Sequence, residues 1–228
     1  MSHFFITGTD TGVGKTVVTA GLVRALQVGG RRCVGMKPVA AGCELKDGVW
    51  RNEDVDQLLA AANVAVSADD INVYPLRAAI APHIAAAQEG VAIDLANIRK
   101  AFAALTERAD AVLVEGVGGF VVPLNDDADT ADLAHELALP VILVVGLRLG
   151  CLNHALLTAE AIRARGLTLA GWVGNSIDAT MPARDENIAA LHARLAAPCL
   201  GIVHWTAAAT NPAIIATFLN PTSLLQGP

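Results

Sequence analysis

The sequence lacks the long apolar run that a membrane-spanning helix requires. Its longest such run, Leu137–Leu147, is interrupted by Pro140 and Gly146, whereas a span takes about 20 residues. Met1–His3 contain neither the basic stretch nor the apolar stretch that opens a secretory signal. We therefore expect no membrane partner and a cytoplasmic location.

Paired cysteines and excess positive charge are also missing. The four cysteines form no C-x-x-C pair, which argues against a zinc site or a redox dithiol, and we expect reduced thiols. The formal net charge of −6 provides no electrostatic footprint for nucleic acid, so we expect no such partner.

No low-complexity linker and no internal repeat divides the 228 residues. We therefore expect a single domain over residues 1–228. Short apolar runs alternate with helix-like segments, a pattern typical of an α/β fold with a mostly parallel central sheet and helices on both faces. The expected strands are Phe4–Thr7, Cys33–Lys37, Ala111–Glu115, Val141–Gly146, Ala170–Val173 and Cys199–Val203. The expected helices are Thr16–Val28, Glu53–Ala62, Pro82–Gly90, Ala96–Thr106, His154–Arg165 and Asp185–Leu195.

A glycine-rich loop joins the first expected strand to the first expected helix. It reads Gly8-Thr9-Asp10-Thr11-Gly12-Val13-Gly14-Lys15-Thr16, the composition of a phosphate-binding loop (P-loop), in which backbone N–H groups and a helix N-terminus surround phosphates. Lys15 is expected to reach the β- and γ-phosphates, and Thr16 to bind Mg²⁺. The loop is a variant form, because Thr9 stands where the strict pattern has glycine and Gly8 lies one residue early. The sequence therefore predicts a three-layer P-loop NTPase-type sandwich that binds a nucleoside triphosphate.

Polar residues with suitable chemistry follow several expected strands, and ligands of such sheets lie beyond the strands' carboxyl ends. Glu115 closes a buried strand and is suited to hold Mg²⁺, although a carboxylate that caps the next turn is the alternative. Lys37 ends the second strand near the loop, although a surface lysine is the alternative. Asp54 is either a second metal ligand or a helix-start residue. Asn175 either binds a nucleotide base or occupies a turn.

Together these segments resemble the dethiobiotin synthetase family. The resemblance covers nearly the whole chain and lies in Thr7–Thr16, Lys37–Val39, Ala81–His83, Val114–Gly119, Leu149–Ala155 and Gly171–Asn175. Among these, Gly150-Cys151-Leu152-Asn153-His154-Ala155 after a strand is the most specific. The resemblance implies an ATP- and Mg²⁺-dependent cyclo-ligase. Such an enzyme adds CO₂ to 7,8-diaminononanoate as a carbamate, phosphorylates the carbamate with ATP, and closes the ureido ring of dethiobiotin.

The resemblance also assigns roles to individual residues. It implies Mg²⁺ ligands at Thr16, Asp54 and Glu115, and catalytic side chains at Thr11, Lys15 and Lys37. It implies a nucleotide site made of Gly12, Val13, Gly14, Lys15, Thr16, Val17, Asp54, Glu115, Gly116, Val117, Gly118, Asn175, Ser176, His204, Trp205 and Thr206. It implies a substrate site made of Thr11, Lys37, Ala41, Gly150, Cys151, Leu152 and Asn153. In the family the segment after Gly150 comes from the other subunit, so a homodimer with composite sites is expected.

Two positions depart from the family pattern, and one other protein class remains as an alternative. Ala41 replaces the usual serine, so either water or Thr11 supplies the missing hydroxyl or the substrate binds more weakly. His204 replaces a proline near the adenine, which leaves the nucleotide preference open. Partition and cell-division switch ATPases share the loop architecture. However, they carry an extra early lysine and a basic patch or terminal amphipathic helix, which this sequence lacks.

Overall fold

The computed structural model describes residues 3–205 and 211–225. Its centre is a sheet of six strands in the order β10-β9-β8-β1-β7-β2, and each neighbouring pair is parallel. The strands are β1 (Phe4–Gly8), β2 (Cys33–Met36), β7 (Ala111–Glu115), β8 (Val141–Leu147), β9 (Leu169–Ser176) and β10 (Cys199–Val203). All six expected strands are therefore confirmed, with ends shifted by up to three residues.

The four strands at the middle and β2 edge of this sheet are buried at every residue. Successive side chains of a strand point to opposite faces, so unbroken burial means that helices cover both faces. The apolar, β-branched sequences of these strands fit that position. The fold is thus the expected α/β sandwich of the P-loop NTPase type.

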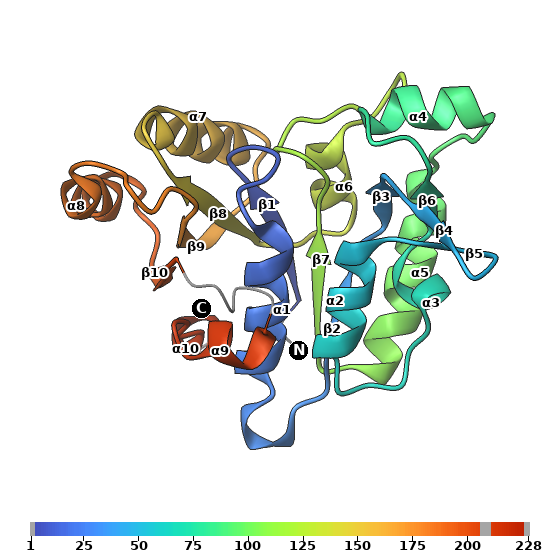
Figure 1. Ribbon diagram of the computed structural model, residues 1–228, viewed down its shortest axis with the longest axis horizontal. Coiled ribbons are helices and arrows are strands. Elements are labelled where there is room, and N and C mark those ends of the chain that lie inside the picture. The colour runs from blue at the N-terminus through green and yellow to red at the C-terminus, as the bar shows by residue number, and fades with distance from the viewer. Residues whose placement is uncertain (1–2, 206–210, 226–228) are drawn as a thin grey trace.

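Helices around the sheet form two groups by their contacts. On one side α1 (Lys15–Leu26) packs against α2 (Glu53–Ala61) and α9 (Pro212–Ala216), and all three lie together in Figure 1. The other group includes α5 (Leu95–Arg108), which contacts β7 and α6 (Thr130–Glu136), and α7 (Cys151–Ala164), which contacts β8 and α8 (Arg184–Arg194). The expected helices near α1, α2, α5, α7 and α8 are confirmed, as is α4 (Pro82–Glu89).

Several small elements between β2 and α5 were not predicted. The chain continues from β2 into β3 (Val39–Ala41), which pairs in parallel with β6 (Tyr74–Leu76). Between them, β4 (Glu44–Lys46) and β5 (Val49–Arg51) form an exposed antiparallel hairpin, and α3 (Ala68–Ile71) follows α2. The remaining small elements are a 3₁₀ turn at Val28–Gly30 and α10 (Thr222–Leu225). These pieces are too short to give a periodic signal.

Two expected strand ends need correction. β2 ends at Met36, so Lys37 follows the strand, and its N–H donates to the Ile71 carbonyl at 2.8 Å. β9 extends to Ser176, so Asn175 lies inside the strand and not in a turn. Among the described residues, no helix is long and apolar enough to cross a membrane.

Candidate active site

The glycine-rich loop between β1 and α1 is shaped by three glycines. Gly12 and Gly14 have φ values of +73° and +85°, a left-handed conformation that glycine adopts without strain. A side chain on Gly14 would also collide with the amide of Asn175. A Cβ on Gly8 would lie 2.7 Å from Val13 Cγ2, too close for real atoms. Gly8, one position early by the strict motif, is therefore required by packing.

Thr9 compensates for its departure from the motif. Its hydroxyl accepts a hydrogen bond from the Gly146 N–H at 3.4 Å, and its own N–H donates to the Val144 carbonyl at 3.0 Å. Both partners belong to β8, the neighbour of β1 in the sheet. The variant loop is thus fastened to β8 at the position where the strict motif has glycine.

Lys15 begins α1 and is almost fully buried. Its ammonium donates to the Asp10 carbonyl at 3.0 Å. Burial, and then the nearby positive charge of Lys37, lower the pKa of Lys15 to about 8. The loop thus holds a lysine whose charge is costly until an anion arrives to stabilise it.

A buried charge cluster lies beside the loop. The side chain of Lys37 is 5% exposed, and its ammonium lies 2.6 Å from Glu115 Oε1 and 2.9 Å from Asp54 Oδ2. The Thr16 hydroxyl donates to the same Glu115 oxygen at 2.8 Å. The alternative of a surface lysine is therefore wrong, and the structure brings Thr16, Lys37, Asp54 and Glu115 together as expected.

The charges in this cluster stabilise one another. Burial opposes the charged form of Lys37, but Glu115 and then Asp54 outweigh it and raise the pKa of Lys37. Burial would raise the pKa of Asp54, yet the Lys37 ammonium holds that pKa below its usual value. With Lys15 included, two ammonium groups and two carboxylates make the site electrically balanced.

The oxygen atoms of this cluster are suited to a magnesium ion. Glu115 Oε2 is buried and has no hydrogen-bond partner among the described residues, an arrangement that a protein normally avoids. Two carboxylates and a hydroxyl are the donors that Mg²⁺ prefers, and Mg²⁺ usually completes its shell with phosphate oxygens and water. The described residues hold no group of three or more His, Cys, Asp or Glu side chains suited to a metal. Thr16, Asp54 and Glu115 can therefore hold Mg²⁺ only together with outside ligands.

Asn52 orients Asp54, a function that the sequence did not reveal. Its side-chain oxygen accepts from the N–H groups of Asp54 and Val55, so it caps α2 and places Asp54 in the first turn. Its amide donates to the Ala41 carbonyl at 3.2 Å. The helix-start alternative for Asp54 is therefore correct, and its side chain also contacts Lys37, so its role as a metal ligand stays a prediction.

The expected base-binding residues lie at the ends of β9 and β10. Asn175 donates from its amide to the Val13 carbonyl at 2.9 Å, so its side chain supports the loop. Ser176 is buried, and its hydroxyl has no partner among the described residues. His204 packs edge-on against Phe218 with ring centres 5.5 Å apart, and Trp205 is largely exposed. Thr206 lies outside the described residues.

The loop after β7 approaches the P-loop. Gly116 donates its N–H to the Ile6 carbonyl at 2.9 Å. Gly118 has a φ of +65°, and a Cβ placed there would lie 3.6 Å from the Thr11 hydroxyl. Thr11 itself is exposed, and Val117 and Val17 are partly buried against the core. Gly118 thus lies beside Thr11, and Gly116 is fastened to β1.

The start of α7 carries the last group of expected residues. Gly150, with φ of +94°, is the N-cap, and the Cys151 N–H donates to the Arg148 carbonyl at 3.0 Å. The N–H groups of Leu152 and Asn153 have no such bond within the described part of the chain. The Arg148 guanidinium lies 2.7 Å from the Asp10 carboxylate in the P-loop. No sequence motif points to Arg148, although its position directly after a parallel strand was a usable signal.

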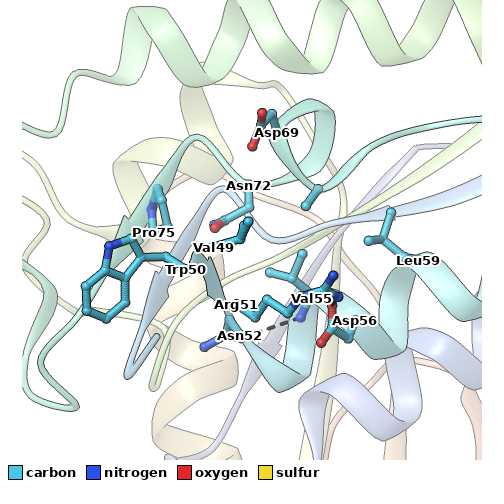
Figure 2. A pocket seen from close by; sticks show the side chains of 11 residues that line it. Val49, Trp50, Arg51, Asn52, Val55, Asp56, Leu59, Asp69, Asn72 and Pro75 are labelled. Carbon is cyan, nitrogen blue, oxygen red and sulfur yellow. Dashed lines mark hydrogen bonds and ion pairs between the residues drawn. The ribbon is translucent and has the colours of Figure 1, made fainter. Parts of the chain in front are cut away.

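A separate hollow of about 250 Å³ lies under the β4–β5 hairpin (Figure 2). Trp50, Val55 and Leu59 give it apolar walls, and Asp56 and Asp69 lie at its edge. It contains none of the expected site residues. Asn52 lines it and also caps the helix that carries Asp54, so the hollow borders the active site without being part of it.

Comparison with known proteins identifies the family. The AAA domain family matches residues 2–213. The ATP-dependent dethiobiotin synthetase BioD of Aromatoleum aromaticum is 58% identical over 216 residues, which cover 95% of this chain and 96% of the relative. The chain belongs to the dethiobiotin synthetase family. The dethiobiotin synthetase BioD of a Janthinobacterium species is 54% identical over 228 residues, with 98% and 96% coverage. The predicted resemblance to dethiobiotin synthetases is confirmed.

Solved structures with a similar fold are more distant in sequence. The cell division protein MinD of Aquifex aeolicus is 19% identical with a TM-score of 0.57, covering 93% of this chain and 87% of that one. A ParA family ATPase of Chlorobium tepidum is 12% identical with a TM-score of 0.57, covering 99% and 92%. At this level of identity, MinD and the ParA family ATPase show a shared fold alone.

Proposed function

We propose that this protein is a ligase that uses ATP and Mg²⁺ to close a ureido ring on 7,8-diaminononanoate, forming dethiobiotin from the diamine and CO₂. The observation that carries the proposal is the buried Lys37 between Asp54 and Glu115, directly beside the P-loop. Phosphoryl transfer needs positioned positive charge and a metal site more than covalent chemistry. Family membership supports the choice of substrate.

The P-loop residues would bind and orient the triphosphate. Backbone N–H groups of Gly12 to Val17 surround the phosphates at the start of α1, and Lys15 leaves the Asp10 carbonyl to contact the γ-phosphate. Lys37 neutralises charge on the carbamate and on the transferring phosphoryl group. Thr16, Asp54 and Glu115 would hold Mg²⁺, which supplies further charge neutralisation at the phosphates.

The carboxylate of the substrate would bind at the start of α7. The N–H groups of Leu152 and Asn153 are available there, and a helix N-terminus attracts negative charge. The Cys151 N–H already donates to Arg148, so it is a weaker candidate than the sequence suggested. We propose, from the family resemblance, that this helix start serves the site of a second copy in a homodimer.

The direct test incubates the purified protein with diaminononanoate, bicarbonate, Mg²⁺ and ATP. Mass spectrometry then looks for the ureido product, and a coupled assay measures released phosphate. We expect one product molecule for each phosphate. ATP hydrolysis without a ureido product would favour a switch ATPase and would overturn the proposal.

Glu115→Gln tests the metal site, because it removes the charge and keeps the shape. The carboxylate loses a charged interaction worth about 1.5–3 kcal/mol, so the Mg²⁺ concentration for half-maximal turnover should rise roughly 10- to 100-fold. A Mg²⁺ titration of steady-state turnover measures this change. Asp110→Asn is a matched control, because Asp110 directly precedes β7 at the end opposite Glu115, and it should leave the titration unchanged. If the Mg²⁺ titration curves of Glu115→Gln and the parent coincide, Glu115 is not a metal ligand.

Hybrid dimers test the composite site. Cys151 is buried, so a bulky substitution there would disturb the fold, whereas Asn153 is exposed. Asn153→Glu adds a negative charge that a helix N-terminus tolerates but that repels the substrate carboxylate. When Asn153→Glu protein is mixed with Lys37→Ala protein and subunit exchange is confirmed, the mixture should show about a quarter of the parent activity. Half of the dimers are then hybrids, each with one intact site. If both variants are inactive alone and their mixture stays inactive, each chain builds its site alone.

A further inference from the structure

Asp10 is the one charged residue of the P-loop motif to which the proposed function gives no role. Its side chain and its main chain both make contacts. The carboxylate accepts from the Thr11 N–H at 2.8 Å and from the Arg148 guanidinium at 2.7 Å. Its main-chain carbonyl accepts from the Lys15 ammonium at 3.0 Å. Asp10 therefore touches two of the three proposed catalytic residues and a distant loop.

Arg148 is the partner of Asp10 and also makes contacts at both ends. Its guanidinium contacts Asp10, while its carbonyl accepts the Cys151 N–H at 3.0 Å and so closes the turn that begins α7. A continuous series of polar contacts thus runs from Lys15 through Asp10 and Arg148 to Cys151. It joins the phosphate end of the site to the helix start proposed for the substrate carboxylate.

The ion pair between Asp10 and Arg148 is not placed to stabilise the fold. The two side chains are 48% and 45% exposed, and exposed pairs contribute little to stability. The parallel pairing of β1 with β8 and the two hydrogen bonds of Thr9 already fix the strands relative to each other. What the pair adds is a fixed relation between the two loops that leave those strands.

We infer that Asp10 and Arg148 are a positioning pair that sets the start of α7 relative to the P-loop of the same chain, and thereby the position of the substrate carboxylate that binds at this helix start. The inference rests on the proposed function for the identity of the substrate. Small displacements of a bound substrate strongly reduce rates, so an energetically weak contact can matter to turnover. If the site is composite, the pair links the P-loop of one chain to the substrate of its partner.

Three variants test this inference by kinetics. Asp10→Asn keeps an acceptor for the Thr11 N–H and removes the ion pair, Arg148→Met removes it from the other side, and the third variant combines both. The loss of an exposed pair corresponds to about a two- to fivefold change. We expect each single variant to raise KM for the diamine by this factor, with KM for ATP unchanged. The combined variant should be no worse than either single variant, and Arg148→Lys should recover at least half of the loss.

Arg32 and Asp110 provide the matched control. They form an ion pair of 2.8 Å with similar exposure at the amino ends of β2 and β7, on the opposite edge of the sheet. Arg32→Met should leave both KM values unchanged. Equal effects of Arg32→Met and Arg148→Met would mean that surface charge alone matters. An effect of Arg148→Met that Asp10→Asn does not reproduce would mean that Arg148 contacts the ligand directly. Either result, or additive losses in the combined variant, would overturn the inference.

Hydrogen exchange supplies a readout that does not depend on the reaction. In Arg148→Met, the amide of Cys151 and the amide of Thr11 should exchange severalfold faster than in the parent, whereas Arg32→Met should change neither. This measurement separates two failures. A parent without ureido product but with these exchange effects would contradict the proposed function and keep the link between the loops. An active parent whose Arg148→Met variant shows unchanged exchange and kinetics would contradict the link itself.

Discussion

Lys37→Ala is expected to lower turnover roughly 100- to 1,000-fold, the usual effect of removing one group that stabilises charge in a transition state. The ammonium lies 2.6 Å from Glu115 and 2.9 Å from Asp54, next to the P-loop, where a carbamate and a phosphoryl group would meet. Steady-state turnover with saturating diamine, ATP and Mg²⁺ measures this effect. Lys46→Ala, which removes a lysine from an exposed pair with Glu44, is the matched control. Turnover near that of the parent would remove Lys37 from the mechanism.

Replacing Lys37 should also change stability and metal binding. Removing one partner of a buried ion pair leaves an uncompensated charge and costs roughly 3–5 kcal/mol, less here because the Asp54 side chain is 40% exposed. Mg²⁺ can replace the lost positive charge. Lys37→Met should therefore bind Mn²⁺, a spectroscopic substitute, more tightly than the parent without nucleotide, and Mg²⁺ should restore its thermal stability. Weaker Mn²⁺ binding would contradict this interpretation.

Lys15→Met is expected to cause the second large loss, again roughly 100- to 1,000-fold, because this ammonium would contact the phosphates. Its charge should also be visible in the pH dependence. The pKa of Lys15 is lowered to about 8 by burial and by Lys37, so the free protein loses the charge as the pH rises through 8. The ratio kcat/KM for ATP reports groups of the free enzyme and should decline above about pH 8. In Lys15→Arg that decline should disappear, because a guanidinium stays protonated. A decline that persists in Lys15→Arg belongs to another group.

The lowered pKa of Lys15 also has a consequence for stability. An ordinary lysine pKa is 10.5, so the unfolded chain binds more protons than the folded one between about pH 8 and 10.5. Stability gained from this group therefore rises with pH across that interval. Lys37 behaves oppositely, since its pKa is raised by its carboxylate partners. Its contribution is present up to its ordinary pKa and is lost as the pH rises through the raised value.

The sheet and the P-loop were predictable because local sequence determines both. Val112-Leu113-Val114 and Val141–Val145 are continuous apolar runs, which only a strand covered on both faces suits. The loop follows from its own glycines and from Lys15 and Thr16. In each case the residues that determine the structure lie within about ten positions of one another, so a short segment of the sequence is enough to predict it.

The remaining features depend on contacts between distant segments. Nothing near Lys37 in the sequence indicates that Asp54 and Glu115 bury it. Arg148 acquires its meaning only through Asp10, 138 residues earlier. The β4–β5 hairpin was not predicted, because its two strands on either side of Asp47 and Gly48 are short and exposed and bury no apolar face. Sequence reasoning therefore selected residues that the structure places together, and missed the contacts that orient them.

The packing around Gly8 and Gly14 has a consequence for how this enzyme can evolve. A methyl group at Gly8 would lie 2.7 Å from Val13 Cγ2 and one at Gly14 would collide with the Asn175 amide nitrogen, so either substitution would force these side chains to move. The end proposed to face the base is more open, because Trp205 is largely exposed and His204 packs edge-on against Phe218. Libraries that seek a new nucleotide preference should therefore randomise His204 and Trp205 and leave the glycine positions fixed. Natural relatives should likewise vary more at positions 204 and 205 than at positions 8 and 14.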